Sequence, residues 1–291
     1  MVTTAAVLHG DRARLLRFHE DEHPVALQLG GSDPKDLAQA ARIGAEVGYD
    51  AINLNVGCPS DRVQSGAFGA VLMASGELVR DCVAAMRDAV DVPVTVKCRI
   101  GVDDQVPEDI LPAFLETVAQ SGVTEFTIHA RMAWLQGLSP KENRDIPPLN
   151  YPLVVAMKDR FPHLNIGING GITGLDQVAS FLDEGLDGVM VGRAAYHDPA
   201  GVLMRADSAI FGTDDPVETA EGAVLAMLDY IESELVSGTR LNAITRHMLG
   251  LFVGRPGARH WRRHLSETAH KPGSGPDVVL EAMSGIGAAA A

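Results

Sequence analysis

The sequence has few cysteines and no long apolar run, and both absences exclude classes of protein. Its 291 residues include only Cys58, Cys82 and Cys98, with no Cys-x-x-Cys pair. Three such thiols make no disulfide framework, which fits a reducing compartment, and they argue against a zinc site. No apolar stretch approaches the roughly 18 residues needed to cross a bilayer, and residues 1–24 lack a secretory signal. We therefore expect a cytoplasmic protein without a metal or a membrane anchor.

Positive charge is also scarce, but it is concentrated in one part of the chain. The sequence has 24 Lys and Arg against 38 Asp and Glu, a net charge of −14, which does not by itself suggest a nucleic-acid binder. Residues 239–271, however, contain seven basic residues and one acidic residue, Glu267, which gives this segment a net charge of +6. The basic residues are Arg240, Arg246, Arg255, Arg259, Arg262, Arg263 and Lys271. A polyanion would meet this local patch rather than the total charge.

Short β-branched runs alternate with longer segments of helical periodicity. The expected strands are 25–29, 51–55, 94–98, 126–129, 165–168 and 188–191. Strict alternation of strand and helix indicates parallel pairing with crossover helices. Most of the runs end directly in polar or glycine-rich residues, which is typical of a (β/α)8 TIM-type barrel, whose functional residues lie at the carboxyl ends of its strands. An open doubly wound α/β sheet of six strands is the alternative.

The strand count is two short of a complete barrel. The last two runs end in Asn169-Gly170-Gly171 and Gly192-Arg193, and barrels that bind a phosphate take the site from the loops after strands seven and eight. If these are those loops, the missing pair lies at the N-terminus, and the chain begins near the end of strand two. We therefore expect residues 1–212 to form a barrel domain that lacks strand 1 and most of strand 2.

The pattern changes after Gly212. Residues 213–271 contain helical periodicity only, as in Val224, Met227, Leu228 and Ile231, which predicts a separate small helical-bundle domain that carries the basic patch. Residues 272–291 are rich in Gly, Ser and Ala, so we expect a flexible tail there.

Cys58 is the strongest candidate for a reacting group. It follows the strand that ends at Asn55 and lies in a Gly/Pro loop at the expected rim of the barrel. A thiol there could be a nucleophile, a metal ligand or a proton donor, and no His/Cys cluster at ligand spacing supports the metal. An unperturbed thiol has a pKa near ~8.5 and stays mostly protonated at neutral pH, which suits a general acid. A buried structural thiol is the alternative, and we favour that interpretation for Cys82 and Cys98.

Other strand ends carry groups that could bind a flavin phosphate and ring. Lys97 ends a hydrophobic strand and could stabilise negative charge at the N1–C2=O region of a reduced flavin, or extend to solvent instead. Gln28 could hydrogen-bond the ring edge or stabilise a turn, and His129 could bind a phosphate or ring carbonyl or be a core histidine. The candidates for an anion site are Asn169, Gly170, Gly171, Gly192 and Arg193.

Taken in order, these motifs resemble those of the tRNA-dihydrouridine synthase family. They are GlnLeuGlyGly at 28–31, AsnLeuAsnValGlyCysProSer at 53–60, ThrValLys at 95–97, IleHisAlaArg at 128–131, AsnGlyGly at 169–171 and ValGlyArg at 191–193. The resemblance runs from Met1 to about Thr268. The stretch 134–144 (TrpLeuGlnGlyLeuSerProLysGluAsnArg), with 246–252 and 257–263, is similar to the A-type subfamily, which reduces uridines at positions 20 and 20a of the D-loop.

The resemblance implies a mechanism and a set of roles. FMN would be reduced by NADPH and pass a hydride to C6 of a uracil flipped out of the tRNA, and Cys58 would protonate C5 from the opposite face. By the same resemblance, FMN would be held by Gln28, Lys97, His129, Asn169, Gly170, Gly171, Gly192 and Arg193. The tRNA would contact Asn55, Lys141, Glu142, Arg144, Arg259 and Arg262. We expect a monomer that binds tRNA and NADPH.

The sequence departs from the family pattern at its start. The family's first strand carries a Pro-Met loop beneath the flavin, and nothing here matches it, in agreement with the strand count. We therefore expect the chain to fold poorly or to bind FMN weakly. Two other functions stay open: another FMN barrel oxidoreductase, acting on dihydroorotate or an enone, and an inactive RNA-binding relic of the enzyme.

Overall fold

A computed structural model describes residues 1–60 and 66–287 and divides the chain into two compact units. The first unit comprises Met1–Gly171 with Phe181–Met190, and the second comprises Ile172–Ser180 with the chain from Val191 onward. The division near residue 190 precedes the domain boundary that we expected after Gly212. Each unit is described by itself.

The first unit is built on seven parallel strands that pair in chain order. They are β1 (Val2–Thr3), β2 (Ala26–Gly30), β3 (Ala51–Val56), β4 (Val94–Arg99), β5 (Glu125–His129), β6 (Asn165–Asn169) and β7 (Gly188–Met190). The six expected strands are all confirmed, each within one residue at either end. The short β1 pairs in parallel with the end of β2 through Val2 and Leu29. This sequential strand order with helical crossovers is the α/β TIM-barrel arrangement.

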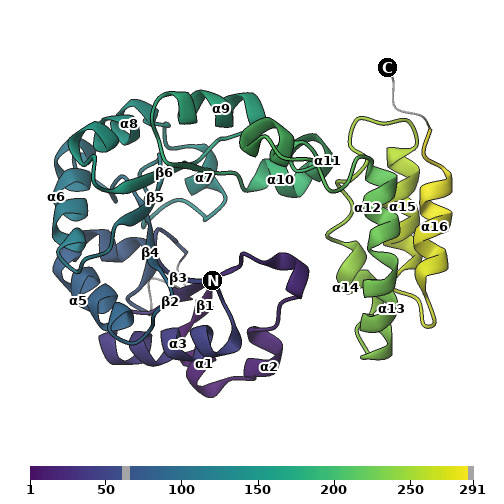
Figure 1. Cartoon of the computed structure of the whole chain (residues 1–291), viewed down its shortest axis with the longest axis horizontal. Helices are drawn as coiled ribbons and strands as arrows, with labels where there is room; N and C mark the ends of the chain where they lie inside the picture. The colour runs from purple at the N-terminus through teal and green to yellow at the C-terminus, as the bar shows by residue number, and fades with distance from the viewer. Residues whose placement is uncertain (61–65, 288–291) are drawn as a thin grey trace. The chain divides into compact units, whose positions relative to one another are not determined.

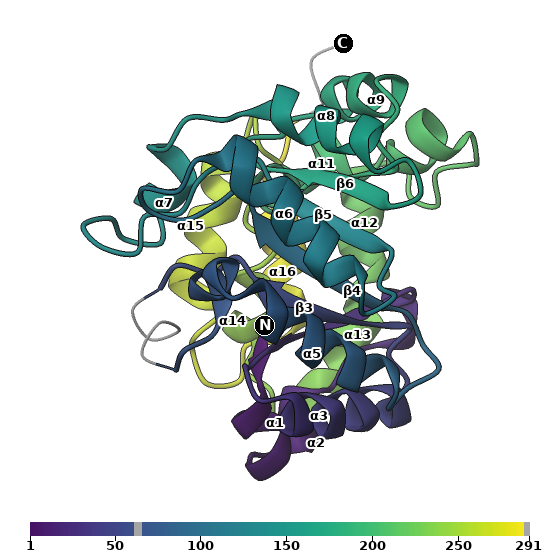
Figure 2. The same cartoon turned by 90° about the vertical axis from the view of Figure 1, so that its left-hand side faces the viewer.

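Helices follow the strands and cover the outer side of the sheet (Figures 1 and 2). Those of the first part of the chain are α1 (Thr4–His9), α2 (Arg12–Leu15), η1 (Glu20–Glu22), α3 (Pro34–Val47), η2 (Gly69–Ala74), α5 (Gly76–Arg87), α6 (Pro107–Ala119), α7 (Glu142–Asp145), α8 (Tyr151–Arg160) and α9 (Leu175–Asp183). Helix α3 begins where Asp33 accepts from the amides of Lys35 and Asp36, and it ends at Gly48 in the left-handed region. A side chain at Gly44 would clash with Leu27 and Ile52, so α3 packs directly on β2 and β3.

The two faces of the sheet differ sharply in polarity. Alternate residues of a strand point to opposite faces. One face carries buried apolar residues, among them Leu29, Leu54, Val96, Phe126 and Ile168, which form the core beneath the helices. The other face carries the polar side chains of the same strands: Gln28, Asn53, Asn55, Thr95, Lys97, Arg99, His129 and Asn169. The fold therefore gathers polar groups from five neighbouring strands on the inner face.

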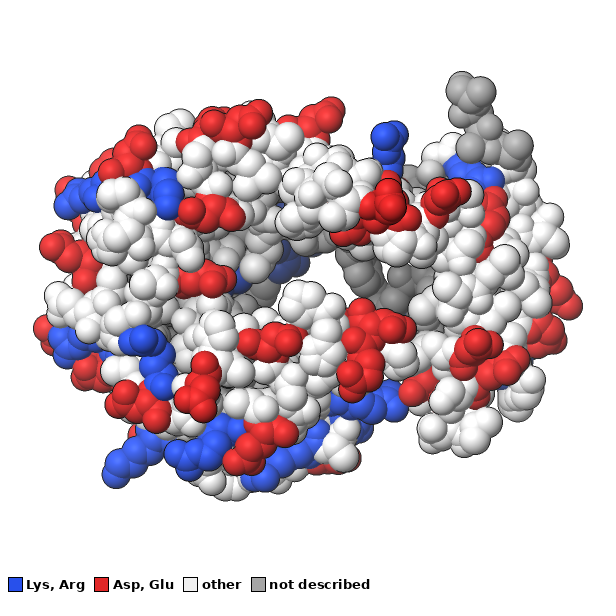
Figure 3. All heavy atoms as spheres, viewed as in Figure 1, with Lys and Arg blue, Asp and Glu red and all other residues white. Residues whose placement is uncertain are grey.

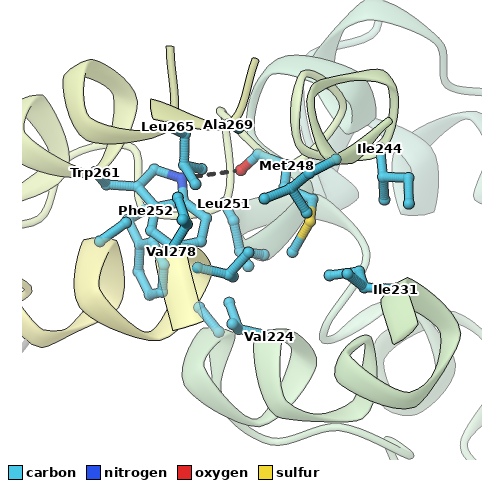
Figure 4. Close-up of a cluster of buried hydrophobic side chains, with 14 of the residues drawn as sticks. Val224, Ile231, Ile244, Met248, Leu251, Phe252, Trp261, Leu265, Ala269 and Val278 are labelled. Carbon is cyan, nitrogen blue, oxygen red and sulfur yellow. Dashed lines mark hydrogen bonds between the residues drawn. The ribbon is translucent and has the colours of Figure 1, made fainter. Parts of the chain in front are cut away.

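The second unit is helical throughout its described residues after Val191. Its helices are α10 (Arg193–His197), α11 (Pro199–Val202), η3 (Asp207–Phe211), α12 (Ala220–Ala226), α13 (Leu228–Val236), α14 (Leu241–Thr245), α15 (Ala258–Thr268) and α16 (Pro276–Ser284). Trp261 is fully buried at the centre of its apolar core, edge-on to Phe252 at 4.9 Å, and its indole N–H donates to the Met248 carbonyl at 3.1 Å (Figure 4). The expected helical bundle is present.

The expectation of a flexible tail over 272–291 is wrong for residues 276–287. Helix α16 buries Val278, Val279 and Ala282 in the core of the second unit, and the Gly287 amide donates to the Pro256 carbonyl at 3.0 Å. The small residues on both sides of this helix dominated the composition of the tail and concealed the apolar face of the helix. Residues 288–291 lie outside the described residues.

Acidic side chains are spread over the face of both units drawn in Figure 3, in keeping with the net charge, while basic ones gather along the lower edge of the first unit in that view. Among the residues that the structure describes, no helix combines the length and the apolar character needed to cross a membrane.

Candidate active site

Strands β2 to β4 are joined on the polar face of the sheet by a directed chain of side-chain hydrogen bonds. The Asn55 carboxamide donates to Gln28 at 2.8 Å, Gln28 donates to Asn53 at 2.8 Å, and Asn53 donates to the Thr95 hydroxyl at 2.7 Å. Asn55 sets the donor-to-acceptor direction of these hydrogen bonds. Its side-chain oxygen accepts from two backbone N–H groups, so its NH₂ group must point toward Gln28. The network therefore fixes which polar atoms Gln28 presents at the rim.

Every backbone N–H and C=O group of Gly57 and Cys58 has a hydrogen-bond partner. The Asn55 side-chain oxygen accepts from the amides of Gly57 at 3.1 Å and Cys58 at 2.9 Å. The Gly57 carbonyl accepts from the Arg99 guanidinium at 3.2 Å, and the Cys58 carbonyl accepts from the Ala70 amide at 2.9 Å. Two side chains and the start of η2 thus determine where the thiol lies.

The three thiols occupy different environments. Cys58 is half-buried, and its Sγ lies 3.6 Å from the Ser60 hydroxyl oxygen, a weak thiol hydrogen bond. Cys82 and Cys98 are completely buried among apolar side chains, and burial raises the pKa of each to about 12. These two are structural thiols, as expected, because they pack on the helix side of the sheet. Only Cys58 combines access with a polar neighbourhood.

Lys97 is a half-buried cation on the inner face. Its ammonium donates to the Asn169 carboxamide oxygen at 2.9 Å, and the Asn169 NH₂ donates to the Met190 carbonyl at 2.7 Å. Burial, with a smaller contribution from the nearby Arg99, lowers the pKa of Lys97 to about 8. A cation that is poorly solvated gains from an incoming negative charge, so this position suits an electron-rich ligand.

The turn after β6 is shaped for close approach to a ligand or a neighbouring chain. Gly170 and Gly171 both have positive φ, 112° and 71°. A side chain at Gly171 would lie 2.7 Å from Leu149 and 2.8 Å from the Tyr151 hydroxyl, and one at Gly170 would crowd the buried His129 ring. Only glycine suits position 171, because it adopts the positive φ without strain and has no side chain to clash with Leu149 and Tyr151. Residues 169–171, Lys97, His129 and Gln28 therefore lie at one edge of the sheet, with donors and a cation suited to a flavin and its phosphate.

Other expected site residues lie outside this cluster. Gly192 and Arg193 are exposed in the second unit, where Arg193 is the first residue of α10. Lys141 is exposed directly before α7, and Arg144 is exposed within it. Hydrogen bonds to the side chain and to the backbone amide of Ser139 lower the pKa of the Glu142 carboxyl.

The basic patch of the second unit is smaller than the sequence indicated. Arg259, Arg262 and Arg263 are exposed on α15, while Trp261 and Leu265 of the same helix are buried. Arg255 is instead a structural residue, because its guanidinium pairs with Glu221 at 2.6 Å and donates to the Gly287 carbonyl at 2.8 Å. The patch available to a polyanion therefore excludes Arg255.

Two residues of the site were missed by the sequence analysis. Arg99 is not among the residues that the sequence pattern singled out, yet it is buried and holds the Cys58 loop. Asn143 is a neighbour in sequence of three expected tRNA contacts, Lys141, Glu142 and Arg144. It is completely buried, and its side chain hydrogen-bonds the Trp134 backbone in their loop. A polar residue flanked by charged ones gives no signal of burial, so the pattern could not distinguish Asn143. Among the described residues, no group of three His, Cys, Asp or Glu could hold a metal ion.

Comparisons with known proteins agree on one family. The model described as Dihydrouridine synthase (Dus) matches residues 1–284. The chain is 57% identical over 287 residues to the tRNA-dihydrouridine(20/20a) synthase of Vibrio cholerae, covering 98% of this chain and 87% of the relative. It is 58% identical over 284 residues to the Escherichia coli K12 protein of the same name, covering 97% and 81%. A solved old yellow enzyme homologue from Zymomonas mobilis aligns with a TM-score of 0.42 at 14% identity, over 57% of this chain and 49% of that chain.

The Asn55 carboxamide should be worth more to stability than an ordinary capping residue. Asn55→Ala leaves two amides and the Gln28 oxygen without a partner in a buried site, so we expect the free energy of unfolding to fall by about 2–3 kcal/mol. Urea denaturation followed by circular dichroism measures it. The matched control is Asn150→Ala, which removes one N-cap bond to Leu153 and should cost about 1 kcal/mol. Equal losses in the two variants would contradict the proposed network.

Proposed function

Because the chain belongs to the dihydrouridine synthase family, we propose that it reduces uridines 20 and 20a in the D-loop of tRNA to 5,6-dihydrouridine. The near full-length identity to enzymes named for this reaction supports the substrate. The observation that carries the proposal is the immobilised Cys58 loop, which places an accessible thiol at the same sheet edge as Lys97, His129 and Asn169.

The residues at the sheet edge fit FMN, which supplies a hydride when it is bound and is reduced again by NADPH. Gln28 offers the second N–H of its carboxamide, whose orientation the network already sets, and Lys97 offers a positive charge where the flavin ring becomes electron-rich. The backbone of Gly170 and Gly171 can approach a phosphate without obstruction by a side chain. His129 at this edge, and Gly192 and Arg193 from the second unit, complete the proposed set.

Cys58 acts in this proposal as the general acid. Once C6 of the uracil has gained a hydride, C5 must gain a proton, or the reduction reverses. The S–H bond of Cys58 breaks as the C5–H bond forms, and the resulting thiolate regains a proton from solvent. Ser60, at 3.6 Å from Sγ, orients the thiol proton and is the first group through which that proton can return.

The tRNA contacts are drawn from three places. Lys141 and Arg144 are exposed beside α7, Glu142 lies between them, and Arg259 and Arg262 are exposed on α15. Lysine and arginine side chains of this kind bind phosphates. Asn55 contacts the substrate nucleotide through the second N–H of its carboxamide, since its oxygen and its first N–H serve the Cys58 loop and Gln28. We further propose that the protein works as a cytoplasmic monomer with NADPH as reductant.

Replacing the thiol should stop the second half of the reaction and leave the first half intact. With Cys58→Ala, NADPH should still reduce bound FMN, and tRNA should bind within about twofold of the normal Kd. Reoxidation of the reduced enzyme by dihydrouridine-free tRNA should slow by about 10²- to 10⁴-fold, the usual contribution of a general acid. Anaerobic mixing followed by flavin absorbance measures each step.

Cys82→Ala is the matched control for this prediction, because that thiol is buried in α5 away from the polar face of the sheet. It should reoxidise at the normal rate. Mass spectrometry of tRNA from a deletion strain complemented with Cys58→Ala gives the cellular answer. Full recovery of dihydrouridine there would overturn the general-acid role, and no dihydrouridine with the unaltered chain would overturn the proposed function.

The low pKa of Lys97 predicts that FMN affinity depends on pH. The charged ammonium favours the ring, and the pKa of about 8 means that most of the free protein loses this charge by pH 9. Above this pKa, Lys97 must take up a proton when FMN binds. The apparent affinity for FMN should therefore fall by about tenfold between pH 7 and pH 9. Fluorescence titration measures it. Lys97→Met should bind weakly at both pH values, and a pH-independent affinity in the unaltered protein would contradict the role of Lys97.

A further inference from the structure

Arg99 is a buried cation whose partners among the described residues are backbone carbonyls. It is 4% exposed, and no described carboxylate pairs with it. Burial, together with the nearby Arg144 and Arg131, lowers its pKa to about 10, although Cys58 favours the charged form. Arg99 therefore stays charged at neutral pH in a place where a cation is costly. If Arg99 served only to fill space, a neutral side chain at this position would give a more stable fold.

The guanidinium joins two loops that are far apart in the sequence. Its Nε donates to the Gly57 carbonyl at 3.2 Å, directly before Cys58. Its Nη1 donates to the carbonyls of Met132 at 3.1 Å and Asn143 at 2.9 Å. The planar fork of arginine can hold both loops at once, which the single ammonium of a lysine cannot.

Asn143 extends this connection into the segment 134–144. Its side chain donates to the carbonyls of Trp134 at 2.8 Å and Leu138 at 3.1 Å and accepts from the Trp134 amide at 2.7 Å. Asn143 is fully buried, whereas Trp134 and Lys141 are exposed. Figure 2 shows this segment, in teal beside α7, projecting from the first unit. One buried amide therefore closes the loop that carries the proposed tRNA contacts.

The geometry points to Arg99 as a positioning residue that clamps the Cys58 loop to the segment 134–144, so that the segment that meets the tRNA also sets the place of the thiol. This inference rests on the proposed function, because it concerns delivery of the Cys58 proton to a tRNA nucleotide. Arg99 itself takes no part in proton transfer. Its effect passes through the Gly57 carbonyl on one side and the Asn143 carbonyl on the other.

Alkylation of Cys58 by iodoacetamide, followed by mass spectrometry of the native protein, tests the clamp without any cofactor. Cys82 and Cys98 are fully buried and serve as unreactive internal references. Arg99→Lys keeps the charge beside the thiol but cannot span both loops, so Cys58 should react faster by about threefold or more. Asn143→Ala should increase the rate similarly, although Asn143 does not touch Cys58, and the double variant should exceed neither single variant by much.

Reoxidation of the reduced enzyme by tRNA supplies the second readout. Both single variants should slow it by about 10- to 100-fold, with flavin reduction by NADPH unchanged. The matched control is Arg87→Lys, since the exposed Arg87 also donates to a backbone carbonyl, that of Ser121, but both residues precede the amino ends of β4 and β5. Where a variant unfolds, Asn143→Asp keeps the side-chain volume and removes the two donated bonds.

The clamp is overturned if Asn143→Ala leaves the alkylation of Cys58 unchanged, or if the effects of Arg99→Lys and Asn143→Ala multiply in the double variant. Either result would mean that the two loops move independently. Failure of the proposed function looks different, because the unaltered protein would then not be reoxidised by tRNA at all, while the alkylation rates would still report on the clamp.

Discussion

The proposed site depends on one constraint, namely that the thiol proposed to react lies in a short Gly/Pro loop whose backbone needs partners outside the loop. A loop of this kind has few internal hydrogen bonds, so its backbone must find partners elsewhere. Asn55, Arg99 and the amide of Ala70 supply them, and they come from the end of β3, the end of β4 and the start of η2. The parallel sheet brings these groups together, because all of its strands end at the same edge. In the proposed function, the contribution of the fold is therefore to hold the Cys58 thiol in a fixed position.

The positions of individual charged residues in this protein indicate more about ligand binding than its net charge does. A chain of net charge −14 keeps exposed arginines on α15 and exposed cations beside α7, and it buries Lys97 and Arg99 on the inner face of the sheet. The two buried cations differ in their partners, since Lys97 bonds a side-chain amide and Arg99 bonds backbone carbonyls. The first arrangement leaves a cation available to a ligand. The second uses the cation to hold the protein together.

Much of the fold and part of the site could be predicted because their signals are short in range. Short β-branched runs located six of the seven strands, and the residues at or after their ends indicated Cys58, Lys97 and Asn169 as candidates. What escaped prediction depends on pairing between distant positions. The tie from Arg99 to Asn143 joins residues 44 apart in the chain, and the pair of Arg255 with Glu221 joins residues 34 apart. The helix over 276–284 was missed for a different reason, because its flanking small residues dominated the composition.

The central claim is that the Cys58 loop is held rigidly before any ligand binds, and amide hydrogen exchange tests it most directly. With the protein alone in D₂O, the amides of Gly57 and Cys58 should be protected to a degree similar to those of β3, since both donate to the Asn55 side chain. Peptide-level mass spectrometry can compare 57–58 with the strand directly before it. Protection of this kind would support a preformed position for the thiol. Exchange at the rate of an unstructured peptide would contradict the account, because a mobile loop could not place the proton.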